Sequence, residues 1–286
     1  DNNRISGLFD EEYILGGFIL SLFPTLLIMT FYMNQNKLNK IIIFFLVLLF
    51  CYTIIISGER SSFIKLILLI CGFVFFTSFL GTFKKKIVFF ICSIFLIFFV
   101  TLNNPKLSER LIYHTFDLLL QKEHGNKIDR EKSIVEILQN EYNSGKIKFT
   151  YFSKEHHDHA TISLKMFKDN ILFGHGIKMF RFKCGEKKYY INSRSCSTHS
   201  HGIVLSFLSE TGIIGVVFLI ITYFYLIKSI LRFKIIYNIN STILISIIII
   251  LFPSLPSGYF FNNFFSMVLY TLVGLYLGSK KIFKNT

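Results

Sequence analysis

Two histidines, His199 and His201, stand directly before a long apolar run that starts at residue 203. A neutral imidazole can take a proton from a hydroxyl group near neutral pH, so this pair suits general-base chemistry. Glu210 follows His201 by nine residues, inside the apolar run, where a carboxylate is costly unless it faces a cavity or a partner. The pattern predicts a reactive site at a membrane boundary. The alternative is that the histidines are interfacial polar residues and Glu210 is a hydrogen-bonding residue between helices.

Arg60 is the second residue whose type and place suggest chemistry. It lies in Ser57-Gly58-Glu59-Arg60, a short loop between two apolar runs. A planar guanidinium binds phosphate through paired hydrogen bonds, which makes Arg60 a candidate phosphate ligand. The alternatives are a snorkelling membrane anchor and an ion pair with Glu59. Arg4 is a further candidate, although a lone arginine in a polar stretch is usually a solvated residue.

A histidine-rich stretch, His156, His157, Asp158 and His159, looks like a metal site only superficially. Histidines two positions apart, as at 157 and 159, fit a strand or a loop better than one face of a helix. No cysteine or second carboxylate stands at a supporting spacing, so we expect no metal and no other cofactor. The sequence also contains no P-loop, dinucleotide-binding, Gly-x-Ser-x-Gly or His-Glu-x-x-His motif.

Membrane helices must position these residues. Of the 286 residues, 52% are hydrophobic, and the mean hydropathy is +0.53. Runs such as 41–56 and 87–102 carry no charged side chain, and roughly 20 such residues cross a bilayer as one helix. The sequence therefore predicts an all-α polytopic membrane protein with about seven transmembrane helices. We place the spans at residues 13–33, 40–57, 62–80, 87–102, 203–227, 239–256 and 262–279.

The distribution of basic residues predicts the orientation. The formal net charge of +14 is carried largely by short loops between apolar runs, which is a topology signal and argues against nucleic acid as a partner. Eleven basic residues fall on one side, which the positive-inside rule assigns to the cytoplasm. We therefore expect Arg60 and residues 103–202 to face the periplasm of a bacterial inner membrane. The eleven are Lys37, Lys40, Lys84, Lys85, Lys86, Lys228, Arg232, Lys234, Lys280, Lys281 and Lys284.

The predicted spans divide the chain into three regions. Residues 1–102 form an N-terminal part of the bundle with four spans, and residues 203–286 form a C-terminal part with three. Residues 103–202 between them form a large periplasmic loop. The chain starts at Asp1 without a methionine, so we interpret it as a fragment that lacks upstream spans.

The periplasmic loop contains helical patterns and two cysteines. Apolar residues recur at helical spacing in residues 133–142 and 161–170, which predicts two short helices. Cys184 and Cys196 lie twelve positions apart in an oxidising compartment, which permits a disulfide; two free thiols are the alternative. Near the last apolar run, residues 252–263 hold two prolines and a glycine, which predicts broken backbone that lines a cavity or forms a tight hairpin.

Four elements, in this order along the chain, resemble the O-antigen ligase family of bacterial membrane proteins. Residues 4–9 resemble its Arg-x-x-Gly-x-Phe stretch, and residues 57–60 resemble its short Gly-x-Arg element outside a span. Residues 170–176 resemble its Asn-Pro-hydrophobic-Gly-x-Gly turn, with isoleucine where proline is usual. Residues 201–215 resemble its His-Asn-x-x-Leu-x-x-Leu-x-Glu-x-Gly-x-x-Gly signature, with Gly202 in place of the asparagine.

The resemblance implies a metal-independent, inverting transfer of a glycan from undecaprenyl pyrophosphate to a lipid A-core acceptor. On this analogy His201 is the general base or the residue that orients the acceptor, His199 stands beside it, and Glu210 supports them. The pyrophosphate would lie against arginines, namely Arg60, Arg4 and, from the periplasmic loop, Arg181 and Arg194.

Three other activities remain open at this point. An O-antigen or polysaccharide polymerase performs the same chemistry on a lipid-linked acceptor, and a protein O-oligosaccharyltransferase performs it on a protein. A transporter of the lipid-linked glycan is a more distant alternative. Transporters typically show internal repeats and ionisable residues at mid-membrane. We find no repeat, and the candidate residues gather at one face of the predicted bundle.

Overall fold

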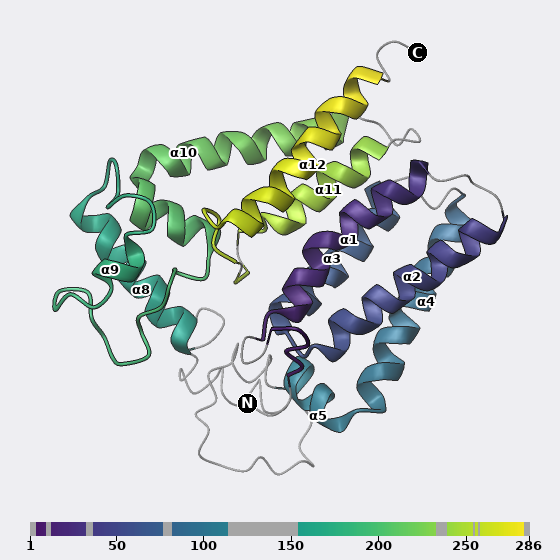
Figure 1. The fold of residues 1–286 in the computed structure, drawn as a ribbon, viewed down its shortest axis with the longest axis horizontal. Helices are drawn as coiled ribbons and strands as arrows, with labels where there is room; N and C mark the ends of the chain where they lie inside the picture. The colour runs from purple at the N-terminus through teal and green to yellow at the C-terminus, as the bar shows by residue number, and fades with distance from the viewer. Residues whose placement is uncertain are drawn as a thin grey trace, which may run out of the picture.

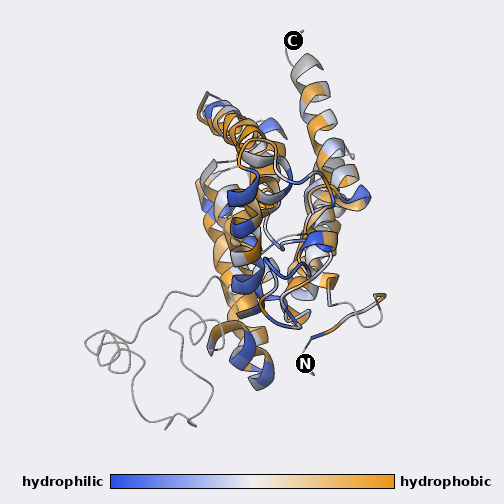
Figure 2. Cartoon of the chain, turned by 90° about the vertical axis from the view of Figure 1, so that its left-hand side faces the viewer, coloured by the Kyte–Doolittle hydropathy of each residue, from blue (hydrophilic) through white to orange (hydrophobic). Residues whose placement is uncertain are grey.

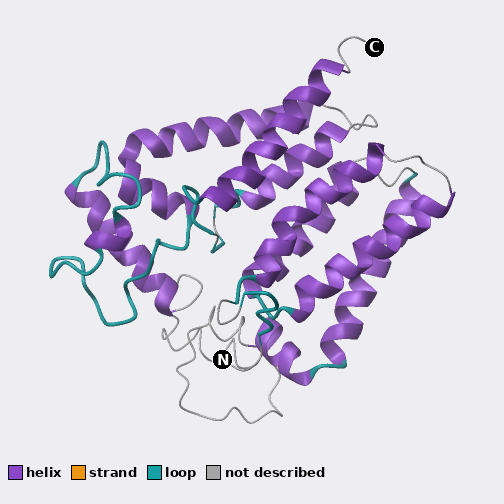
Figure 3. Ribbon diagram, in the orientation of Figure 1, coloured by secondary structure: helices purple, strands orange, loops and turns teal. Residues whose placement is uncertain are grey.

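The computed structural model is helical throughout the part of the chain that it describes, with no strand there (Figure 3). The all-α class predicted from the sequence is therefore confirmed for that part. The predicted helix at 133–142 lies outside the described residues. The described residues are 4–9, 13–32, 37–76, 82–113, 154–232, 239–253, 255–256 and 258–282.

Each of the seven predicted spans coincides with a helix, because the runs of apolar side chains are bounded by charges, glycines or prolines that end helices. Four helices come from the N-terminal third and three from the C-terminal third, with short helices between them (Figure 1). The bounds are α1 (Leu15–Tyr32), α2 (Lys37–Ile56), α3 (Arg60–Phe76), α4 (Phe83–Leu102), α5 (Pro105–Ser108), η1 (Glu109–Tyr113), α8 (Lys154–Asp169), α9 (Phe180–Lys183), α10 (Ile203–Arg232), α11 (Ile239–Ile250) and α12 (Asn263–Ile282).

Helix length does not confirm seven transmembrane spans. By length and composition, one described helix, Ile203–Leu231, is sufficient to cross a membrane alone. Lys86–Leu102 and Pro105–Tyr113 qualify only as a pair, which is bent by 110°. The predicted sixth span is shorter as a helix, because the chain breaks around Pro253: α11 has 12 residues and rises about 18 Å, against roughly 30 Å of hydrocarbon.

Two apolar clusters hold the long helices together. The first joins α1 to α4 around buried residues such as Ile54 and Leu66, and the second joins α10 to α12 around residues such as Leu272. Helix α11 belongs to both, since Ile245 packs in the first cluster and Ile243 in the second. Figure 2 shows apolar residues running along most of the helices. Because α11 joins the clusters, the starts of α3 and α10 are held in one body.

A sharp break in α10 anchors the segment that precedes α9. Gly212 adopts a φ of 65° and a ψ of −159° inside the helix, and the freed amide of Ile213 donates to the carbonyl of Ile171 at 2.8 Å. A Cβ on Gly212 would stand 2.5 Å from the carbonyl oxygen of Leu172, and one on Gly174 would stand 2.4 Å from the carbonyl carbon of Glu210. Both positions therefore require glycine.

Residues 154–202, the described part of the segment that follows η1 and precedes α10, pack on α10 as a small cap. Helix α8 covers the predicted helix at 161–170 except for its last residue, and it buries Ile162 and Met166 against Phe180 of α9. Figure 1 shows α8 and α9 beside the start of α10. The division of the chain into regions 1–102, 103–202 and 203–286 stays a prediction.

Candidate functional site

A cavity of about 870 Å³ gathers polar side chains from distant parts of the sequence. The first residues of the chain and the start of α3 contribute to it, together with one residue of α8, the segment 198–201 and the broken backbone after α11. Two groups of lining residues carry the chemistry. We call them the imidazole cluster, His156, His199 and His201, and the cation cluster, Arg4, Arg60 and Lys65.

The imidazole cluster is built from two elements. The ring centroids of His199 and His201 lie 4.1 Å apart, and His156 of α8 lies 5.4 Å from His201. A fourth ring, that of buried His159, stacks on His201 at 5.0 Å. The sequence-based view of these residues was wrong on one point. Residues 156–159 lie in α8, so His156 and His159, three apart, share a helical face toward His201.

The surroundings of His201 keep its imidazole neutral. Burial lowers its pKa to about 2, and the neighbouring imidazoles of His199, His156 and His159 add to the effect. Burial likewise lowers the pKa of His156 to about 4. His201 also adopts a φ of 54°, a left-handed conformation that few residues other than glycine take. A neutral ring keeps a lone pair available at the cavity, although its low pKa makes it a weak base while no anion is bound there.

A further positive charge, that of Arg110, lies near Arg4 and Arg60 of the cation cluster. Burial lowers the pKa of Arg4, and the nearby guanidinium of Arg110 lowers it further. The Nε of Arg4 is buried and has no hydrogen-bond partner among the described residues, so it has a donor to offer to an anion. Arg110 itself is held in place by a 2.9 Å hydrogen bond from its Nε to the carbonyl of Gly58.

Glu59 ties the cation cluster to α1. Its carboxylate accepts hydrogen bonds from the backbone amides of Gly16 at 2.6 Å and Gly17 at 3.0 Å, in the first turn of the helix. Ser62 donates to the same carboxylate at 2.8 Å. Burial raises the pKa of Glu59, while these hydrogen bonds act in the opposite direction. The carboxylate thus holds the first turn of α1 against the start of α3, where Arg60 lies.

Glu210 organises the protein backbone next to the imidazole cluster and does not line the cavity. Its carboxylate accepts hydrogen bonds from the backbone amides of Lys178 at 3.0 Å and Phe180 at 3.3 Å, and from the hydroxyl of Tyr259. The Tyr259 ring in turn lies 5.6 Å from the ring of His199. Glu210 therefore connects α10, the segment before α9 and the backbone after α11. Its supporting role, as we see it, is to position His199 through Tyr259.

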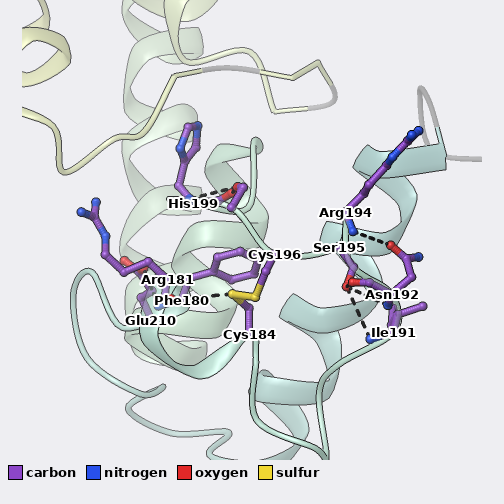
Figure 4. The surroundings of a disulfide bond; sticks show 11 residues. Phe180, Arg181, Cys184, Ile191, Asn192, Arg194, Ser195, Cys196, His199 and Glu210 are labelled. Carbon is purple, nitrogen blue, oxygen red and sulfur yellow. Dashed lines mark hydrogen bonds between the residues drawn. A yellow bond between two sulfur atoms is a disulfide. The ribbon is translucent and has the colours of Figure 1, made fainter.

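The remaining predicted site residues are the two cysteines and the arginines Arg181 and Arg194, which lie on opposite sides of the disulfide (Figure 4). Cys184 and Cys196 are bonded through their Sγ atoms. Arg181 lines the cavity, whereas Arg194 does not. Figure 4 shows Arg181 and His199 on one side of the disulfide and Arg194 on the other. The structure thus brings His199, His201, Arg4, Arg60 and Arg181 to one cavity and leaves Arg194 outside it.

Four lining or adjacent residues were missed by sequence reasoning. Two carried a signal: Lys65 is a charge inside a predicted span, and His156 lies three residues before His159. Tyr259 and Arg110 carried none, because only tertiary packing places them here. Pro256, Gly258, Tyr259 and Asn262 do contribute to the lining, which favours the cavity interpretation of that broken segment over a plain hairpin. Within the described residues, no group of three His, Cys, Asp or Glu side chains is arranged to hold a metal ion.

Comparison with known proteins gives one match. The family model described as O-antigen ligase matches residues 44–220 of the chain. These residues include Arg60, both histidines before α10 and the whole cap. Neither a curated protein nor a solved structure matches the chain.

Proposed function

Because the chain belongs to the O-antigen ligase family, we propose that it transfers a glycan from undecaprenyl pyrophosphate to a lipid A-core acceptor. Members of this family are membrane-embedded, glycosyltransferase-like enzymes involved in lipopolysaccharide biosynthesis. In our proposal the protein lies in the bacterial inner membrane with its site facing the periplasm. The single observation that carries the proposal is the shared cavity, in which neutral imidazoles and guanidinium groups line one space.

The proposed reaction needs a base for the acceptor. His201 accepts the proton of an acceptor hydroxyl, and the hydroxyl oxygen forms a bond to the anomeric carbon of the donor sugar. Attack from the face opposite the leaving group inverts that carbon. Burial keeps His201 neutral at neutral pH, so its lone pair is available, and the negative charge of a pyrophosphate bound in the same cavity would raise its affinity for the proton. His199, whose ring lies 4.1 Å away, is placed to share that role.

The proposed reaction also needs compensation for a leaving pyrophosphate. As the bond between the anomeric carbon and the pyrophosphate oxygen breaks, negative charge grows on the leaving group. Arg60, Arg4 and Arg181 line the same cavity as His201 and supply fixed positive charge there. Guanidinium groups provide this stabilisation directly through charged hydrogen bonds, so the step as we propose it runs without a metal.

Purified protein in proteoliposomes, supplied with lipid-linked glycan and lipid A-core, tests the proposal. We expect transfer of the glycan to the core, with loss of most activity in His201→Ala. A wild-type protein that transports the lipid-linked glycan without transferring it would contradict the proposal. Gels of lipopolysaccharide from a deletion strain separate the related activities. Loss of all O-antigen from the core indicates a ligase, whereas a single attached repeat indicates a polymerase.

A further inference from the structure

Lys65 is a buried cation that the proposed reaction leaves without a role. It lies in α3, five residues after Arg60, and therefore about 7.5 Å further along the helix axis. Its side chain is 7% exposed and lines the same cavity as Arg4 and Arg60. The cavity thus carries positive charge at two depths along α3.

The hydrogen bonds of Lys65 leave most of its capacity unused. Its Nζ donates to the carbonyl of Pro256 at 3.3 Å, and an ammonium group has three protons to donate. In the part of the chain that the structure describes, Lys65 forms no ion pair with a carboxylate. The neighbouring carboxylate, that of Glu59, is engaged by the first turn of α1 and by Ser62.

A buried ammonium inside an apolar helix is costly unless an opposite charge or a cavity compensates it. The cation cluster supplies three positive charges to the cavity, against the one carboxylate of Glu59 among its lining residues. An anion that enters the cavity would therefore be bound by charge at both depths. A pyrophosphate attached to an apolar lipid is such an anion, since its two phosphates are offset along the lipid axis.

We propose that Lys65 binds the lipid-proximal phosphate of the donor, while Arg60 and Arg4 bind the phosphate attached to the sugar. The inference rests on the proposed function, and it assigns separate cationic side chains to each of the two phosphates of the donor. The order follows from the geometry of α3, because Arg60 begins the helix and Lys65 lies deeper among buried apolar residues such as Leu66 and Leu69. The apolar chain of the donor belongs on that deeper side.

Two lipids that lack the glycan separate the subsites: the pyrophosphate product of the proposed transfer and the corresponding monophosphate. Polyprenyl monophosphate keeps only the lipid-proximal phosphate, whereas polyprenyl pyrophosphate carries both. Each is tested as a competitive inhibitor of glycan transfer in phosphatidylcholine proteoliposomes, where the donor and the acceptor are the only other anionic lipids. Lys65→Gln removes the charge but can still donate to Pro256, whereas Lys65→Met removes both. Lys86→Met is the matched control, because Lys86 is also 7% exposed but lies outside the cavity lining.

We expect both Lys65 variants to weaken inhibition by the monophosphate and by the pyrophosphate by the same factor, roughly tenfold or more. Arg60→Lys should weaken inhibition by the pyrophosphate more than inhibition by the monophosphate. Lys86→Met should leave both inhibition constants unchanged. Monodisperse elution in detergent establishes that each variant is folded, and Lys65→Gln decides the question alone if Lys65→Met is not.

Two results would overturn the inference. In one, Lys65→Gln is inhibited as strongly as the wild type by both lipids, which would make Lys65 only a tether for the backbone at Pro256. In the other, Lys65→Gln weakens the pyrophosphate alone, which would place Lys65 on the sugar side. Failure of the proposed function gives a different result. The wild type itself would then not transfer the glycan, so no inhibition constant could be measured for either lipid.

Discussion

The imidazole cluster and the cation cluster line one cavity but are built in opposite ways. Rings packed against one another and buried together make up the first cluster, so His201 and His156 stay neutral at neutral pH. The second places fixed charges at the start of α3 and on the segment before α1, close to additional arginine. The contrast teaches that burial serves two ends here: it keeps a base neutral in one cluster and concentrates positive charge in the other.

Replacing His201 should distinguish most clearly between the contributions of the two clusters to the reaction. In our account His201→Ala removes the proton acceptor and leaves the cation cluster intact. We expect kcat to fall roughly 100- to 10,000-fold while the KM for the lipid-linked donor changes little. Steady-state kinetics in proteoliposomes measure both constants. A variant that is inserted normally and transfers glycan at the wild-type rate would refute the role of His201.

Arg60→Lys tests the cation cluster by the opposite pattern. Lysine keeps the charge but loses the forked guanidinium geometry, so we expect kcat/KM for the donor to fall roughly 10- to 100-fold. Arg194→Lys is the matched control, since Arg194 lies outside the cavity lining, and it should behave as the wild type. Equal effects of the two changes would remove the distinction that we draw between these arginines.

Gly212→Ala tests how the imidazole cluster is held in place. The added Cβ would meet the carbonyl oxygen of Leu172 at 2.5 Å, in a left-handed conformation. We expect a loss of about 2 kcal/mol in unfolding free energy and a fall in kcat of about tenfold, because the cap and Glu210 shift. Thermal unfolding in detergent and kinetics measure the two effects. Gly274→Ala, where the new Cβ meets nothing within 4 Å, should be neutral.

We expect the smallest effect from a change of pH, which tests whether the imidazole cluster is held neutral. The pKa of His201 is about 2, so its ring stays neutral well below pH 6. We expect kcat/KM, which reports the pKa values of the free enzyme, to change less than about twofold between pH 7.5 and 5.5, whereas an ordinary imidazole would cost about tenfold at the lower pH. A pH–rate profile with a midpoint near 6.5 would show that His201 is not held neutral.

The same pKa shift predicts the direction of the change in stability. The unfolded chain binds a proton at this histidine below pH 6.5, while the folded chain does not until about pH 2. In that window the free energy of unfolding rises with pH and falls as the solution becomes acidic. Thermal melts in detergent at pH 7 and pH 5 measure the change, which should be smaller in His201→Ala.

The helices and the broken segment after α11 could be predicted from the local sequence, because apolar runs and a pair of prolines determine the backbone within a few residues. The helix ends at Ile250 and at Ile203 agree with such signals. The break at Gly212 could not be predicted in this way, since a glycine in an apolar run is equally typical of close packing between helices. The count of seven spans is not confirmed, because an apolar run such as 239–256 exceeds the helix that forms within it.

The site followed from the sequence only where motifs carried it. His201 and Arg60 were predicted to act together, and both line the cavity. His156 carried a signal in its spacing of three from His159, but its contact with His201 depends on the packing of α8 on α10, which local spacing does not reveal. Arg194 was assigned by residue type alone, and its backbone amide instead bonds to the Asn192 side chain at 2.9 Å.

The central claim is that the bond broken in the donor lies between the two clusters. A lipid-linked donor with a diazirine on its first sugar tests this most directly, with the labelled peptides identified by mass spectrometry. We predict labels in both segment 198–202 and segment 59–65, and their loss when polyprenyl pyrophosphate is present in excess. Labels confined to one of these segments, or found in neither, would contradict the account.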